Sequence, residues 1–127
     1  MTNNPPHILV IEDNPNNIKL MVMLLEQQNY QVTVDTNAEA GIINAKKLLP
    51  DLVLLDIQLP EMDGMEACQI MRQESSLEYT PIVALTAFAM PGDRERILEN
   101  GFNEYMSKPI NYRDFLNLVN KILNHEN

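Results

Sequence analysis

The sequence predicts an α/β domain of three layers, in which helices cover both faces of a parallel five-stranded sheet. Three observations support this fold class. Short apolar runs alternate with segments of helical periodicity, residues typical of helix caps and strand borders stand between them, and no internal repeat interrupts the order. The 127 residues, 45% of them hydrophobic, suffice for one average-sized domain with a core of its own.

Five short segments are predicted as strands. They consist mainly of apolar or β-branched residues without polar alternation, which is typical of strands buried on both faces of a parallel sheet. The four clear segments are residues 8–11, 32–34, 52–55 and 82–85, and residues 104–106 form a weaker fifth. Pro50 and Pro81 stand just before two of these segments, where a missing backbone N–H does least harm.

The segments between the strands are predicted as helices. Two of them show the i, i+3, i+4, i+7 spacing of one apolar helix face, which is formed by Ile18, Met21, Val22 and Leu25 and by Phe115, Leu118, Val119 and Ile122. Helix starts are indicated by Asn14 before Pro15, by Asp63 with Glu66 and by Asn111 with Asp114. Gly101 fits a helix C-terminus. The chain therefore reads as five βα units with right-handed crossovers.

Charge and composition exclude several classes of partner. The formal net charge of −9 would repel a phosphate backbone, so nucleic acid is not expected as a partner. The single cysteine, Cys68, cannot form an internal disulfide, and no spacing typical of a zinc site is present. No apolar run approaches the roughly 20 residues of a membrane span, and the first six residues lack the features of a signal peptide. We therefore expect a cytoplasmic protein without membrane contact.

Acidic and polar residues follow the predicted strands. The carboxyl ends of parallel strands meet at one edge of a sheet, where ligands bind. The residues expected at this edge are Glu12 and Asp13 after the first strand, Asp56 after the third, Thr86 at the end of the fourth and Lys108 after the fifth. Residues 1–66 hold 10 of the 18 acidic side chains and 3 of the 9 basic ones, so the first half of the chain supplies most of the acids.

Three acids at one edge would repel each other unless a cation joined them. Oxygen ligands without His or Cys favour Mg²⁺. A carboxylate beside such an ion can attack phosphorus and form an aspartyl phosphate, for which Asp56 is the candidate; capping of a turn is its alternative role. Lys108 could pair with Asp56 and then with the phosphoryl group, or be an ordinary surface lysine. Thr86, on composition alone, is most often a β-forming residue.

Four segments together resemble the response-regulator receiver domains of two-component signalling, the CheY-like superfamily, over residues 8–123. They are ED at 12–13, LLDIQLPEMDG at 54–64, LTA at 85–87 and YMSKPI at 105–110. The resemblance implies a flavodoxin-like, doubly wound (βα)5 sandwich with strand order 2-1-3-4-5. Within the family, residues 84–90 and the short flanks are most similar to single-domain DivK-type regulators, and also to receivers carried by hybrid histidine kinases.

The resemblance implies a metal-assisted phosphoryl acceptor. Asp56 would accept the phosphoryl group from a phosphohistidine of a histidine kinase or a phosphotransfer protein. Asp13, Asp56 and the backbone carbonyl of Gln58 would bind Mg²⁺ directly. Glu12, which stands where Asp is more common, would act largely through water.

The resemblance also implies a switch around this acceptor. Lys108 would contact the phosphoryl oxygens, and its peptide bond to Pro109 would be cis. The Thr86 hydroxyl would close onto the phosphoryl group while Tyr105 moves from an outer to an inner position. Phe88 occupies a position that tunes hydrolysis of the acyl phosphate, where an apolar ring would shield the bond from water.

We therefore expect a stand-alone receiver, a single domain of residues 1–127 with a core at about 7–123. It would catalyse its own phosphorylation and dephosphorylation, act on no separate substrate, and bind a downstream protein through the helix at 92–100, the last strand and the last helix. The alternatives are a receiver module of a hybrid histidine kinase or a scaffold receiver that is never phosphorylated. A phosphatase of the haloacid-dehalogenase type would need an Asp where Gln58 stands, and a flavodoxin-like FMN binder would need a phosphate loop where residues 14–17 read NPNN.

Overall fold

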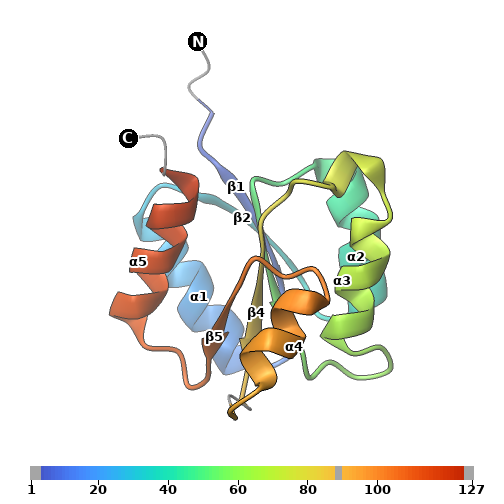
Figure 1. The fold of residues 1–127 in the computed structure, drawn as a ribbon. Helices are drawn as coiled ribbons and strands as arrows, with labels where there is room; N and C mark the ends of the chain where they lie inside the picture. Colours follow the sequence, from blue (N-terminus) through green and yellow to red (C-terminus); the bar gives the residue numbers. More distant parts are fainter. Residues whose placement is uncertain (1–3, 88–89, 125–127) are drawn as a thin grey trace.

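The computed structural model describes residues 4–87 and 90–124. Five parallel strands form one sheet in the order β2-β1-β3-β4-β5. Figure 1 shows the sheet with helices on its two sides. The strands are β1 (His7–Ile11), β2 (Gln31–Asp35), β3 (Leu52–Asp56), β4 (Ile82–Thr86) and β5 (Glu104–Ser107). The α-helices are α1 (Pro15–Gln27), α2 (Ala38–Leu48), α3 (Gly64–Arg72), α4 (Asp93–Glu99) and α5 (Tyr112–Leu123), and a 3₁₀ turn, η1, covers Ser75–Leu77. The predicted fold class is confirmed.

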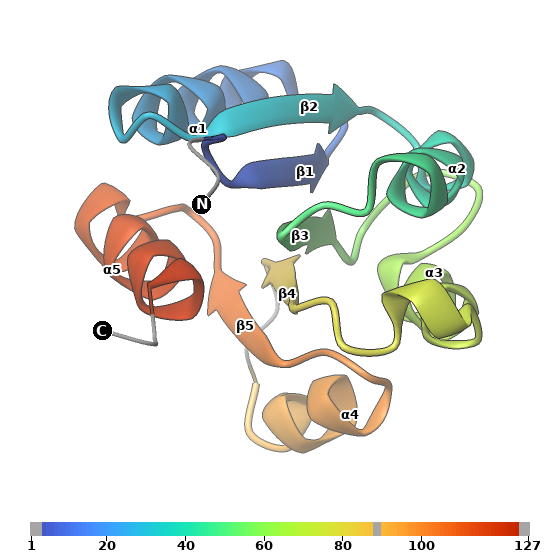
Figure 2. The ribbon, with the colours of Figure 1, turned by 90° about the horizontal axis from the view of Figure 1, so that it is seen from above.

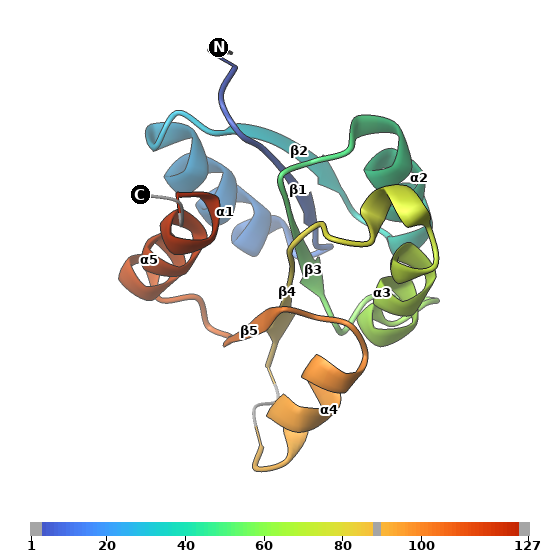
Figure 3. The same ribbon diagram turned by 45° about the horizontal axis from the view of Figure 1, so that its top comes forward.

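Helices cover both faces of the sheet (Figure 2). One apolar cluster joins the sheet to α1 and α5, and a second joins it to α2, α3 and α4. Successive residues of β1 alternate between the clusters, since Ile8 and Val10 belong to the first and Leu9 and Ile11 to the second. This burial on both faces explains why the strands read as continuous apolar runs. At the β5 end of the sheet, α4 stands apart from α2 and α3 (Figure 3).

The predicted cap residues begin the helices. The side chain of Asn14 accepts hydrogen bonds from the backbone N–H groups of Asn16 and Asn17, and Pro15 opens α1. The caps of α3 and α5 work in the same way, with Asp63 accepting from the N–H of Glu66 and Asn111 from that of Asp114. Each cap satisfies N–H groups that have no partner within the helix.

The observed elements differ slightly from the predicted ranges. Strands β3 and β4 extend to Asp56 and Thr86, because these residues continue the ladders opposite Leu85 and Ser107. Helix α4 is shorter than the predicted 92–100, and Gly101 follows its end with a φ of 104°, a left-handed conformation that suits glycine. Within residues 4–87 and 90–124, no helix has both the length and the apolar character that crossing a membrane requires.

Candidate functional site

Three acids gather at the carboxyl ends of β1 and β3. These strands are neighbours with Ile11 opposite Leu55, so the residues that follow, Glu12 and Asp13 on one side and Asp56 on the other, come together. One carboxylate oxygen from each acid lies within 4.8 Å of the others. Glu12 and Asp56 are buried, with exposures of 0% and 1%, whereas Asp13 is exposed. Two members of the cluster are therefore buried in the protein, and its third member faces solvent.

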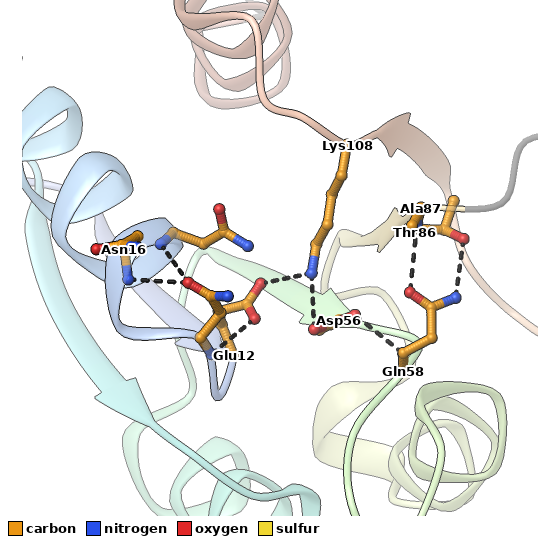
Figure 4. Close-up of polar contacts among 9 residues, drawn as sticks. Glu12, Asn16, Asp56, Gln58, Thr86, Ala87 and Lys108 are labelled. Carbon is orange, nitrogen blue, oxygen red and sulfur yellow. Dashed lines mark hydrogen bonds and ion pairs between the residues drawn. The ribbon is translucent and has the colours of Figure 1, made fainter.

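Lys108 reaches this cluster from the loop after β5. Its Nζ lies 2.8 Å from Asp56 Oδ2 and 3.0 Å from Glu12 Oε1 (Figure 4). Its backbone N–H donates to the carbonyl of Thr86 at 2.7 Å, which fixes the loop against the end of β4, and the Lys108–Pro109 peptide bond is cis. One ammonium group thus contacts two buried carboxylates.

The backbone supplies the remaining contacts of the two buried acids. The N–H of Asn14 donates to Glu12 Oε2 at 3.0 Å, and the N–H of Gln58 donates to Asp56 Oδ1 at 2.9 Å. Glu12 Oε1 is buried without a hydrogen-bond donor in the described part of the chain, and the ion pair with Lys108 is its charged contact. This oxygen retains the capacity to interact with a further positive group or a water.

Burial and mutual proximity shift the pKa values of these groups. Burial raises the pKa of Glu12, and the nearby Asp56 carboxyl group raises it further, against the opposing effects of the Asn14 N–H and the Lys108 ammonium. Burial lowers the pKa of Lys108, but the carboxylates of Asp56 and Glu12 outweigh this effect and raise it overall. Lys108 is therefore fully charged at neutral pH and held between the two acids.

Thr86 and the Gln58 side chain join the β3 and β4 ends of the site. Thr86 is the last residue of β4 and is 2% exposed. The side-chain amide of Gln58 donates from Nε2 to Thr86 Oγ1 at 3.2 Å, and its Oε1 accepts from the N–H of Ala87 at 3.3 Å (Figure 4). The sequence did not predict this side-chain bridge, because nothing in the local sequence indicates a contact across two strands.

Of the two further residues expected in the switch, the structure describes Tyr105 but not Phe88. Tyr105 lies on β5 opposite Ala84, is half-buried, and packs against the cluster that contains α2, α3 and α4. Phe88 lies outside the described residues. The roles of both residues, and the use of the Gln58 carbonyl as a metal ligand, stay predictions.

The donor chemistry of the acid cluster fits a hard divalent cation. Its three residues offer only carboxylate oxygens, which are the ligands that Mg²⁺ and Ca²⁺ prefer. The exposed position of Asp13 leaves room for the waters that Mg²⁺ usually keeps. The mixture of two buried acids and one exposed acid therefore suits Mg²⁺ with an open coordination side.

The sheet order and the acid cluster at this edge of the sheet indicate a receiver domain, and the sequence comparison agrees. Residues 8–120 match the family described as response regulator receiver domain, and the chain belongs to this family. Its members are regulatory switches of two-component systems, not enzymes with a separate substrate, and they interact with histidine kinases. The resemblance inferred from the sequence motifs is confirmed.

Particular relatives are found among regulators and kinases. The chain is 38% identical over 119 residues to the polar-differentiation response regulator DivK of Brucella anthropi, covering 94% of this chain and 97% of DivK. It is 38% identical over 112 residues to the signal transduction histidine-protein kinase BarA of Escherichia coli, covering 88% of this chain but 12% of BarA.

The chain is also similar to a solved structure of a receiver domain. The receiver domain of a sensor histidine kinase from Pseudomonas aeruginosa is 32% identical, with a TM-score of 0.87 and coverage of 94% of this chain and 98% of that one. In that structure a magnesium ion is coordinated in the active site cleft.

Proposed function

We propose that Asp56 accepts a phosphoryl group from a phosphohistidine of a histidine kinase or a phosphotransfer protein. The observation that carries this proposal is the environment of Asp56. Asp56 is 1% exposed and ends β3, where its carboxylate contacts the Lys108 ammonium and lies close to the carboxylates of Glu12 and Asp13. A buried carboxylate that is paired with an ammonium group and belongs to a cluster of acids able to bind a cation is suited to nucleophilic attack on a dianionic phosphoryl group.

The chain itself positions the nucleophile. The Gln58 backbone N–H holds Asp56 Oδ1 and the Lys108 ammonium holds Oδ2. In the transfer, an Asp56 oxygen forms the new bond to phosphorus while the bond from phosphorus to the histidine nitrogen breaks, and its electron pair returns to the imidazole. Lys108 then holds the phosphoryl oxygens as a point charge.

We propose Mg²⁺ as the cofactor of the acid cluster. Asp13, Asp56 and the backbone carbonyl of Gln58 would bind it, and Glu12 would act through water. When bound, the ion would offset the negative charge of the acids and of the incoming phosphoryl group. The carboxylate-only donor set supports this assignment, as does the magnesium ion in the Pseudomonas aeruginosa neighbour.

We also propose that phosphorylation controls binding of a downstream protein through α4, β5 and α5. The phosphoryl group adds about −1.5 to −2 charges at an acidic edge, so nearby groups must rearrange. Thr86 would close its hydroxyl onto the phosphoryl group and Tyr105 would move inward. Within residues 93–99 of α4, Ile97 is the one buried side chain, so this helix is only lightly attached to the sheet and suited to respond.

For the chain as a whole, we propose one receiver domain over residues 1–127 with its core at about 7–123. The proposed location is the cytoplasm, and the net charge of −9 argues against nucleic acid as a partner. A receiver module of a hybrid histidine kinase and a scaffold receiver without phosphorylation are the alternatives. An aspartyl-phosphate phosphatase is disfavoured, because Gln58 stands where that class has its second Asp.

Labelling with acetyl phosphate tests the proposed acceptor without a partner kinase. The protein should gain one phosphoryl group in the presence of Mg²⁺, seen as a mobility shift on a phosphate-affinity gel, and EDTA should abolish the shift. Asp56→Asn should remove it, while Asp114→Asn, a matched change on the exposed side of α5, should not. Equal labelling of wild type and Asp56→Asn would contradict the proposal, and absence of labelling in the wild type would favour the scaffold receiver.

A further inference from the structure

The side chain of Gln58 bridges two loops at the phosphoryl-acceptor edge. Gln58 follows Asp56 by two residues, in the loop after β3, and its amide reaches the end of β4 (Figure 4). The amide nitrogen donates to the Thr86 hydroxyl oxygen and the amide oxygen accepts from the Ala87 N–H. Both polar atoms of one side chain thus engage two consecutive residues of the neighbouring strand and loop.

These two residues lie next to the acceptor. Asp56 is paired with Leu85 across the β3–β4 ladder, so Thr86 and Ala87 follow directly beside it. A phosphoryl group on Asp56 brings three strong acceptor oxygens to this place. A hydroxyl and a backbone N–H are the donors that such oxygens attract. The Gln58 amide oxygen therefore competes with a phosphoryl group for the Ala87 N–H.

We propose that the Gln58 side chain is a latch that keeps Thr86 and Ala87 in the resting arrangement and must release them when Asp56 is phosphorylated. The latch rests on the proposed function, since it opposes a switch that phosphorylation of Asp56 drives. Gln58 is in this sense a positioning residue: its side chain acts through Thr86 and Ala87. The strength of the latch then sets how readily the receiver turns to its phosphorylated form.

The side-chain role can be separated from the backbone role of the same residue. The Gln58 backbone N–H donates to Asp56 Oδ1, and a side-chain substitution leaves this N–H and the adjoining carbonyl in place. Gln58→Met has nearly the same length but neither amide donor nor amide acceptor. Because the Gln58 side chain lies at the surface, we do not expect its replacement to disrupt the core.

The first measurement follows the latch in the unphosphorylated protein. Amide exchange by NMR should become several-fold faster at Ala87 in Gln58→Met, because its N–H loses the Gln58 acceptor. The matched control Gln73→Met, an exposed glutamine at the end of α3, should leave exchange at Ala87 as in the wild type. Unchanged exchange at Ala87 in Gln58→Met would overturn the latch, whatever the chemistry of Asp56.

The second measurement follows its release. Beryllofluoride with Mg²⁺ imitates a phosphoryl group on an aspartate, and we expect it to bind Gln58→Met roughly three- to fivefold more tightly than wild type, since two neutral, partly exposed hydrogen bonds no longer oppose the change. Equal or weaker binding by Gln58→Met would overturn the latch. A wild type that binds no beryllofluoride would instead overturn the proposed function, and Ala87 exchange would still decide whether the contact exists.

Discussion

At the scale of single residues, the balance between Glu12 and Lys108 determines the state of the site. Both carboxylates that contact Lys108 are buried, and one ammonium group cannot offset two negative charges. Burial and the nearby Asp56 raise the pKa of Glu12, which means that the folded protein disfavours its ionised form. The resting site therefore holds an excess negative charge, which a bound divalent cation would offset.

Glu12→Gln tests this charge imbalance. The pKa of Glu12 is raised above its ordinary value of 4.5 on folding, so protonated Glu12 contributes to folding stability at pH values below 4.5. This contribution is lost as the pH rises through the raised pKa. At neutral pH in EDTA, the variant should be as stable as wild type or more so, by up to about 1 kcal/mol. Urea unfolding across pH 4 to 8 measures this, and a clearly less stable variant at neutral pH would refute it.

Cys68 should not react with thiol reagents in the native protein. It is fully buried on the inner face of α3, and this burial raises the pKa of its thiol to about 11. At pH 8 only about one molecule in a thousand would carry the reactive thiolate, even before access is considered. A disulfide reagent such as DTNB should therefore label the native protein only as fast as it unfolds, and fully in denaturant. Rapid labelling of the native protein at pH 8 would contradict this.

At the scale of elements, local signals predicted the helix starts and long-range pairing determined the rest. The caps Asn14, Asp63 and Asn111 could be identified because each acts on N–H groups two or three residues away. The ends of β3 and β4 were predicted one residue short, since pairing with a neighbouring strand, not apolar character, extends them to Asp56 and Thr86. Boundaries set by a partner strand leave no local pattern.

Arg72 connects three elements on the side of the sheet that carries α3 and α4. Its guanidinium donates to the carbonyls of Leu77 and Thr80 at 2.8 and 2.7 Å, to the carbonyl of Gly101 at 2.9 Å and to Asn103 Oδ1 at 2.7 Å. Half-buried at the end of α3, it thereby attaches the loops before β4 and before β5. These contacts join segments that no sequence pattern associates.

Arg72→Leu should destabilise the protein by roughly 3 kcal/mol, because it leaves several partly buried acceptors without their charged donor. Arg113→Leu is the matched control on the exposed side of α5, where we expect a change within about 0.5 kcal/mol. Urea unfolding of both variants measures the difference. Similar stabilities for the two variants would show that the Arg72 contacts contribute little.

At the scale of the whole molecule, topology explains how distant residues form one site. The sheet order places the ends of β1, β3 and β4 side by side, and the β5 loop brings Lys108 to the same edge. The sequence predicted this convergence of Glu12, Asp13, Asp56 and Lys108 from the rule that parallel strands end at a common edge. It could not predict the hydrogen bond between the Gln58 side chain and Thr86, because the direction of this side chain depends on the loop conformation.

The most direct test of the account locates the acceptor chemically. After incubation with acetyl phosphate and Mg²⁺, borohydride reduction converts an aspartyl phosphate to homoserine, and peptide mass spectrometry identifies the changed position. We expect homoserine at position 56 alone, and only when Mg²⁺ was present. Homoserine at Asp13 or any other acid, or modification of equal extent in EDTA, would contradict it.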